Sequence, residues 1–176
     1  MQELSLNILD IVQNSVKAKA TLITVTVLED AKDDKLTITI ADNGCGMSEE
    51  TAKAAVDPFY TTRTTRKVGL GLPFIKMAAE MTGGSFSIES AIGAGTTVTA
   101  VFGLTHIDRM PLGDMCATML TLVSCNTQID FVYAHLSDGQ RFTMDTRQFK
   151  EILGDVPLNT PEVLAFMKDY ITENDF

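Results

Sequence analysis

The sequence predicts an α+β fold, and two observations support this prediction. Apolar residues recur at helical spacing in some stretches, whereas in others they alternate with threonines and serines as in half-buried strands. The alternating stretches come in pairs, separated by segments of helical spacing. The order over about the first hundred residues is therefore helix, two strands, helix, loop, helix, two strands, which is typical of an α+β domain.

The first elements follow from local patterns. Residues 3–18 form an amphipathic helix in this prediction, because their apolar side chains return every three or four positions. Two alternating stretches come next, residues 21–28 and 35–41, and a charged turn joins them as a hairpin. Ser48 is a typical N-cap and precedes two acids, so we expect a short helix that ends near residue 56.

The next helix is expected over residues 69–81, where a glycine-rich start leads into an apolar pattern and two glycines, Gly83 and Gly84, follow its end. Residues 85–90 and 96–102 alternate again and flank a small-residue turn. We therefore expect a second strand pair there.

We divide the chain into two domains, residues 1–103 and a small α+β extension, residues 104–176, whose role the pattern does not indicate. In the extension, helices are expected over residues 111–123 and from Thr160 onward, each beginning at a proline. A hairpin that turns at Asp138 lies between them.

The composition argues against several classes of function. The chain has 14 basic and 23 acidic side chains, and its net charge of −9 argues against binding to nucleic acid or to an anionic membrane surface. No apolar run has the length of a membrane span and no basic leader opens the chain, so we expect a cytoplasmic protein. Its three cysteines lack a metal-ligand spacing, and we expect reduced thiols.

Two motifs in the first fifty residues carry candidate chemistry. In the turn at residues 42–47, Asp42 can accept a hydrogen bond from an amino group, and the two glycines let a ligand approach the backbone. A plain reverse turn is the alternative. Asp10 and Asn14 lie one helical turn apart, where a carboxamide oxygen can bind Mg²⁺ and a carboxylate can act as a base. A solvated helix face is the alternative there.

Two further motifs follow. Residues 58–73 form a basic loop that runs into a glycine-rich helix start, where free N–H groups and cationic side chains can bind phosphate oxygens. An ordinary exposed loop has the same composition. Gly95 and Thr96 close a small-residue turn before a strand, which a plain hairpin also explains.

Taken in order, the four motifs resemble those of the GHKL ATPases, the superfamily of type II topoisomerases, mismatch-repair ATPases, large heat-shock chaperones and sensor histidine kinases. The resemblance covers about residues 4–103 and implies a two-layer sandwich, with helices on one face of a mixed, mostly antiparallel sheet. Lys17 and the phrase Pro-Phe-Tyr-Thr-Thr of the loop are similar to the histidine-kinase branch. An exposed lysine late in a helix is also commonly just solvated.

The resemblance implies an ATP and Mg²⁺ site. Asp42 would accept from the adenine amino group with support from Thr96, Asn14 would bind Mg²⁺, and Asp10 would act as the catalytic base. Residues 58–68 would form a mobile lid anchored by Phe59, although a Phe59 packed in the core is equally compatible. The residues expected to contact the nucleotide are Asn14, Lys17, Asp42, Gly44, Gly46, Thr61, Thr62, Arg63, Gly69, Leu70, Gly71, Leu72 and Thr96.

Three features depart from the family pattern. Asp10 stands where hydrolysing members have glutamate, and its shorter reach puts efficient hydrolysis in doubt. The chain begins at the first motif helix, so we expect a stand-alone domain rather than a conventional sensor kinase. His106, followed by an Arg, a Pro and a Leu, resembles a kinase phosphoacceptor motif, but it comes after the ATPase part and lacks the adjacent acid. A structural histidine is the alternative.

We therefore expect a signalling protein that binds ATP or ADP with Mg²⁺ and transfers phosphate to a histidine or serine of an unidentified partner protein. The alternative is a nucleotide-dependent binding switch, of the anti-sigma or another regulatory type, in which occupancy orders the lid with little catalysis. An interaction domain that has lost nucleotide binding ranks last, because the polar ligand set is intact. A homodimer is left open.

Overall fold

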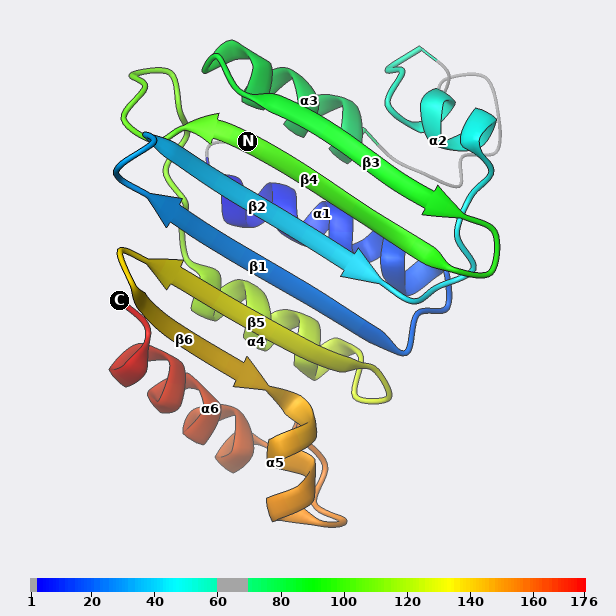
Figure 1. Cartoon of the computed structure of the whole chain (residues 1–176). Coiled ribbons are helices and arrows are strands. Elements are labelled where there is room, and N and C mark those ends of the chain that lie inside the picture. Colours follow the sequence, from blue (N-terminus) through cyan, green and yellow to red (C-terminus); the bar gives the residue numbers. More distant parts are fainter. Residues whose placement is uncertain (1–2, 60–69) are drawn as a thin grey trace.

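The computed structural model describes residues 3–59 and 70–176 (Figure 1). Helices and strands follow one another largely as the sequence predicts. In chain order they are α1 (Leu4–Lys17), β1 (Leu22–Asp30), β2 (Lys35–Asp42), α2 (Glu49–Ala55), α3 (Gly71–Met81), β3 (Ser85–Ala91), β4 (Gly95–Gly103), α4 (Met115–Cys125), β5 (Asp130–Ser137), β6 (Gln140–Asp145), α5 (Thr146–Leu153) and α6 (Pro161–Asn174).

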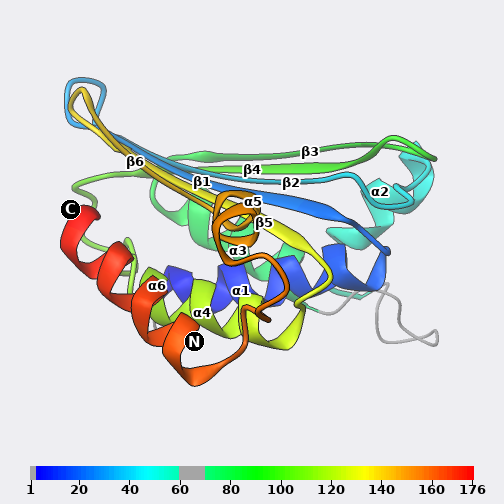
Figure 2. The ribbon, with the colours of Figure 1, turned by 90° about the horizontal axis from the view of Figure 1, so that it is seen from below.

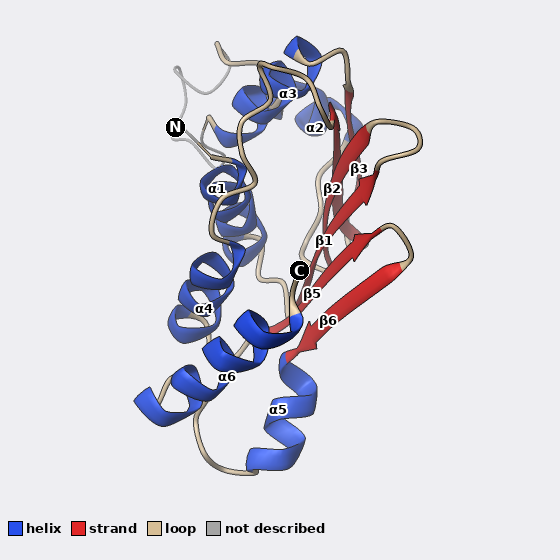
Figure 3. Ribbon diagram, turned by 90° about the vertical axis from the view of Figure 1, so that its left-hand side faces the viewer, coloured by secondary structure: helices blue, strands red, loops and turns tan. Residues whose placement is uncertain are grey.

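The strands form one sheet in the order β3-β4-β2-β1-β5-β6. Strands β1 and β5 run parallel, and the other neighbours pair antiparallel. Helices α1, α3, α4 and α6 lie in a layer on one face of the sheet, and no helix of the described residues covers the opposite face (Figures 2 and 3). The predicted α+β class, with helices on one face of a mixed and mostly antiparallel sheet, is confirmed.

The alternation in the sequence explains why one face of the sheet is buried. In β1, Ile23, Val25 and Val27 are fully buried, while the threonines between them lie on the open face. Helix α1 covers these residues with its own apolar stripe, which includes Leu4 and Ile8. Burying each such aliphatic side chain contributes about 1.5–3 kcal/mol. The apolar patterns of helix and strand together therefore stabilise the packing of the helix on the sheet.

The extension continues the sheet of the first part. Strand β5 pairs with β1 from Leu22–Asp130 to Glu29–Ser137, so residues on both sides of position 103 share one sheet. Their buried side chains also belong to one cluster, which reaches from Leu4 to Ile171. The hairpin predicted around Asp138 is the β5–β6 hairpin.

Two details of the extension differ from the sequence prediction. Helix α4 begins at Met115, capped by Asp114, whose Oδ1 accepts from the Ala117 N–H at 2.8 Å. The helix start predicted at Pro111 is wrong, because the carbonyl of Pro111 accepts from the Leu4 N–H at 2.9 Å and so satisfies the first turn of α1. Helix α5 was not predicted, since it follows β6 without an intervening loop.

Among the described residues, no helix combines the length and the apolarity that crossing a membrane requires.

Candidate functional site

A pocket with a cavity volume of about 630 Å³ opens where β2 and α1 end, on the helical side of the sheet. Six residues that the sequence assigns to nucleotide binding line it, and they are Asn14, Lys17, Asp42, Gly46, Leu72 and Thr96. The other lining residues are Ile11, Ser15, Ala18, Ile40, Cys45, Met47, Ser48, Thr51, Ile92 and Val98. Mostly apolar walls with a few polar groups are typical of a small-molecule site.

Strand register explains how two motifs far apart in the chain meet at this pocket. Asp42 is the last residue of β2, and its partner across the antiparallel pair is Thr96 near the start of β4. Side chains directly opposite each other in such a pair lie about 5 Å apart at their Cβ atoms. The predicted adenine-binding acid and its predicted supporting threonine are therefore neighbours.

The carboxylate of Asp42 is held by two donors from different elements. The Ser15 hydroxyl, on α1, donates to Oδ2 at 2.6 Å, and the Gly44 N–H donates to Oδ1 at 2.8 Å. Each oxygen keeps a further lone pair, and the side chain lines the pocket. The arrangement presents a fixed hydrogen-bond acceptor to any ligand inside.

The two glycines of this turn were predicted to let a ligand approach the backbone, but the structure shows that the packing of the turn itself requires them. A Cβ atom at Gly44 would lie 2.7 Å from the Ala18 carbonyl oxygen. Gly46 has a φ of +69°, and a Cβ there would overlap the Ala91 carbonyl. Glycine is therefore needed because the turn packs tightly between the end of α1 and the β3–β4 turn.

Three residues predicted to act near the Mg²⁺ ion and the phosphates, Asp10, Asn14 and Lys17, come from helix α1. Asn14 and Lys17 line the pocket from α1, and Lys17 is exposed. Asp10 is exposed outside the lining, and a Cβ atom at Gly71 would lie 3.3 Å from the Asp10 Cβ. The predicted base therefore lies against the first turn of α3, where a helix leaves N–H groups without intrahelical partners.

Several of the predicted residues either lie outside the described residues or do not line the pocket. Thr61, Thr62, Arg63 and Gly69, with most of the predicted lid, lie outside the described residues. Leu70 and Gly71 are described but do not line the pocket, and neither does Gly44. Phe59 is 79% exposed, so the alternative in which it packs in the core is wrong.

The roles of Ser15 and Ser90 were not predicted from the sequence. Ser15 lies on the buried face of α1, and its hydroxyl donates to Asp42. The Ser90 Oγ accepts from the Met47 N–H at 2.8 Å and lies 2.7 Å from the Thr96 Oγ1. A hydroxyl residue within an otherwise apolar pattern, as at Ser15, is the signal that could have identified the first of them.

The donor set fits a magnesium ion that is shared with phosphates. Residues 3–59 and 70–176 contain no group of three or more His, Cys, Asp or Glu side chains able to hold a metal. Mg²⁺ commonly takes one or two protein oxygens and completes its coordination with water and substrate phosphates. The Asn14 carboxamide is a donor of this kind at the pocket wall.

His106, the candidate phosphoacceptor, lies at the other end of the sheet. Its N–H donates to the Gly103 carbonyl at 3.3 Å, and Gly103 pairs with Lys35 at the start of β2. Asp42 ends the same strand seven residues later, which is about 23 Å at about 3.3 Å per residue. A nucleotide held by Asp42 therefore binds far from the His106 of the same molecule.

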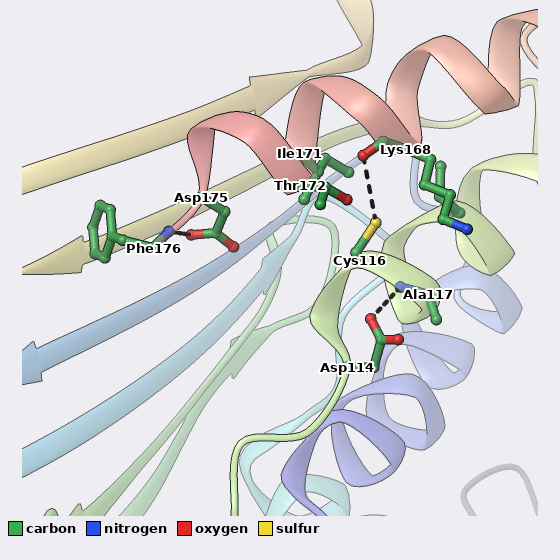
Figure 4. A pocket seen from close by; sticks show the side chains of 9 residues that line it. Asp114, Cys116, Ala117, Lys168, Ile171, Thr172, Asp175 and Phe176 are labelled. Atoms are coloured by element: carbon green, nitrogen blue, oxygen red, sulfur yellow. Dashed lines mark hydrogen bonds between the residues drawn. The ribbon is translucent and has the colours of Figure 1, made fainter.

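A second cavity, of about 540 Å³, lies between α4 and α6 and contains none of the predicted site residues (Figure 4). Cys116 lies in it, and its Sγ is 4.0 Å from the Lys168 carbonyl oxygen. Burial raises the pKa of the Cys116 thiol, so this thiol is less reactive than an ordinary one.

Comparison with known proteins identifies the first part of the chain. The model of the family described as histidine kinase-, DNA gyrase B-, and HSP90-like ATPase matches residues 2–106. The chain is 36% identical over 92 residues to sporulation kinase D of Bacillus subtilis, 35% identical over 96 residues to the histidine protein kinase DivJ of Caulobacter vibrioides, and 34% identical over 94 residues to the sensor histidine kinase ZraS of Klebsiella oxytoca. Each alignment covers 52% of this chain and 18%, 16% and 20% of the respective relative.

Proposed function

Because this chain belongs to the family of histidine kinase-, DNA gyrase B-, and HSP90-like ATPases, we propose that its ATP-binding, histidine-kinase-like domain transfers phosphate to a partner protein. The observation that carries the proposal is the convergence of Asn14, Lys17, Asp42 and Thr96 on one pocket. These residues come from separate sequence motifs, and the chemistry of each side chain suits one part of a nucleotide bound with Mg²⁺. We further propose that the protein acts in the cytoplasm.

Each proposed role follows from the chemistry of one group. Asp42 accepts a hydrogen bond from the adenine amino group, with Thr96 beside it. Asn14 holds Mg²⁺ through its carboxamide oxygen, and Lys17 contacts a phosphate. When bound, Mg²⁺ neutralises charge on the phosphates.

Asp10 is the proposed base for the transfer step. The acceptor's nucleophile forms a bond to the γ-phosphorus while the bond from that phosphorus to the bridging oxygen breaks, so ADP leaves. Where the acceptor is a hydroxyl, its proton passes to the Asp10 carboxylate. The side chain of Asp10 is one methylene shorter than that of glutamate. It therefore favours transfer to an acceptor group that approaches closely, rather than hydrolysis by a loosely held water.

The proposed acceptor lies on another molecule. His106 lies beside the Lys35–Gly103 pair, and Lys35 is about 23 Å along β2 from Asp42 at about 3.3 Å per residue, so transfer to His106 within one molecule is not part of this proposal. A histidine or a serine of a partner protein has no such constraint.

The test is labelled phosphate transfer in an extract of the cells that produce the protein. With γ-labelled Mg²⁺-ATP, the wild-type protein should label another protein, and acid lability of the label would indicate phosphohistidine. Asn14→Ala should abolish the labelling, whereas Gln13→Ala should not, because Gln13 neighbours Asn14 on α1 but does not line the pocket.

Calorimetric titration with Mg²⁺-ATP completes the test. Tight binding without labelling would refute transfer and favour the nucleotide-dependent switch. Absence of binding would refute both functions.

A further inference from the structure

Among the described residues, Ser15 makes the shortest polar contact at the pocket. Its Oγ lies 2.6 Å from the Asp42 Oδ2, and the serine is 4% exposed on the side of α1 that faces the sheet. A separation of 2.5–2.7 Å is typical of a hydroxyl that donates to an ionised carboxylate. The contact thus joins the helix layer to the last residue of β2.

The direction of this hydrogen bond follows from the chemistry of the pair. An ionised carboxylate can only accept, so the single proton of the Ser15 hydroxyl points to Asp42. The Gly44 N–H donates to the other carboxylate oxygen at 2.8 Å. With a donor on each oxygen, the plane of the carboxylate cannot rotate without breaking one of the two bonds.

We propose that Ser15 is a positioning residue, which holds the Asp42 carboxylate in the orientation that accepts the 6-amino group of a purine and thereby sets the preference for adenine over guanine nucleotides. This inference rests on the proposed function. Guanine has a carbonyl oxygen at that position, and two acceptors facing each other repel. A site built around a fixed acceptor rejects the wrong group strongly, whereas a carboxylate free to rotate turns away from it at little cost.

A purely structural role for Ser15 gives a different expectation. If the hydroxyl only fastened α1 to β2, its loss would weaken every nucleotide equally through the shape of the pocket. If it positions Asp42, its loss weakens the binding only of nucleotides that carry an amino group at position 6 of the purine. The loss of affinity for each nucleotide therefore distinguishes the two roles, whereas a measurement of stability does not.

The experiment compares the affinities of ATP, GTP and purine riboside triphosphate, which has hydrogen in place of the amino group, for the wild type and for Ser15→Ala. We expect Ser15→Ala to weaken ATP binding roughly tenfold, the range of one hydrogen bond to a charged group, and to leave purine riboside triphosphate binding within about twofold. The preference for ATP over GTP should narrow by a similar factor.

Two further variants control this comparison. Ser15→Thr keeps a hydroxyl at the position and should restore much of the preference for ATP, even if its added methyl group lowers stability. Ser124→Ala removes a serine whose hydroxyl donates to the Thr121 carbonyl within α4, and it should change neither affinity nor preference.

An equal loss for ATP and for purine riboside triphosphate would overturn the inference, and so would an unchanged preference for ATP over GTP. Both results leave the proposed function standing, provided that the wild type binds ATP. A wild type that binds none of the three nucleotides would instead refute the proposed function, and this inference with it.

Discussion

Two regions of the molecule each centre on a carboxylate with several donors, and they differ in what surrounds it. At the end of β2, the Asp42 carboxylate accepts hydrogen bonds from two neutral donors, and its remaining lone pairs are available to a ligand in an open pocket. At the far end of α6, Asp175 accepts from the Tyr133 hydroxyl at 3.0 Å and from the Phe176 N–H at 2.9 Å, and its Oδ1 is 2.6 Å from the His135 Nδ1.

The second region is a partly buried cluster of side chains around His135. The other ring nitrogen of His135 is 2.8 Å from the Glu29 Oε1, and the ring of Phe176 stacks on the imidazole. Both contacts of His135 are hydrogen bonds only when each ring nitrogen carries a proton. Burial, with Asp175 next to it, raises the pKa of Tyr133, so its hydroxyl stays a donor.

The difference indicates how each region is held in shape. The shape of the pocket depends on backbone, because Gly44, Gly46 and Gly95 stand where a Cβ atom would meet a neighbouring main chain. The cluster depends on side-chain contacts, because it joins Glu29 of β1 to Asp175 just beyond α6 through one histidine. Changes of backbone freedom should therefore damage the first region, and removal of a side-chain partner should damage the second.

The largest effect is expected for Gly46→Ala. Its φ of +69° strains any other residue, and the added Cβ would overlap the Ala91 carbonyl. We expect the free energy of unfolding to fall by about 3–5 kcal/mol, the sum of backbone strain and overpacking. Urea unfolding followed by circular dichroism measures it, and nucleotide affinity should fall as well.

Gly93→Ala is the matched control for this change. Gly93 has a φ of +80°, but a Cβ there would meet nothing within 4 Å. Its cost should be about 1–2 kcal/mol, from the backbone conformation alone. Equal losses for the two variants would show that packing of the turn against Ala91 has no part in the stability of this region.

The next effect is expected for His135→Gln. Its side chain is 3% exposed, and the substitution removes the imidazole nitrogens that contact Glu29 and Asp175. Leaving a buried polar group without its partner costs about 1–3 kcal/mol. Because two carboxylates lose a partner but Glu29 is one-third exposed, we expect the free energy of unfolding to fall by about 2–3 kcal/mol in urea unfolding.

His106→Gln serves as the comparison, since the chain has two histidines. The His106 side chain is 38% exposed and its Nδ1 accepts from the Asp108 N–H at 3.1 Å, so the loss of this surface contact should cost about 0.5–1 kcal/mol. If both variants lost the same stability, the cluster around His135 would not hold α6 to the sheet.

The two regions also differ in how far the sequence predicts them. The acid, the glycines and Thr96 at the pocket are recognisable because their spacing within motifs is local, and strand register then brings the motifs together. Ser48 was likewise predicted as the cap of α2, where its hydroxyl oxygen accepts from the Thr51 N–H at 3.2 Å. Short-range rules of turns and caps are sufficient for such features.

The contacts that the sequence did not predict are long-range. Glu29, His135 and Asp175 come from separate elements, and no local pattern says that β5 lies beside β1. His135 is buried within β5, and its two partners come from β1 and from the residue that follows α6. Ser15 was missed for the same reason, since its partner Asp42 belongs to the next hairpin.

The smallest effect concerns a third carboxylate, Asp145, which caps α5 and pairs with Arg147. Its Oδ2 is 2.9 Å from the Arg147 Nη2, and the Arg147 N–H donates to its Oδ1 at 2.9 Å. Hydrogen bonding to the Arg147 side chain holds the pKa of Asp145 below its ordinary value of 3.8. A lowered pKa in the folded state means that the pair stabilises the protein above pH 3.8 and loses this contribution as the pH falls through the folded pKa.

Asp145→Asn keeps a capping oxygen and removes the charge, so it isolates the ionic part of this contact. At pH 5–7 the variant should be less stable than the wild type by under about 1 kcal/mol, because Arg147 is largely exposed and water screens the pair. Below about pH 4 the difference should shrink as Asp145 itself becomes neutral. Thermal unfolding of both proteins between pH 3 and pH 7 measures it. A difference that persisted unchanged at pH 3 would mean that Asp145 acts on α5 through its shape and not its charge.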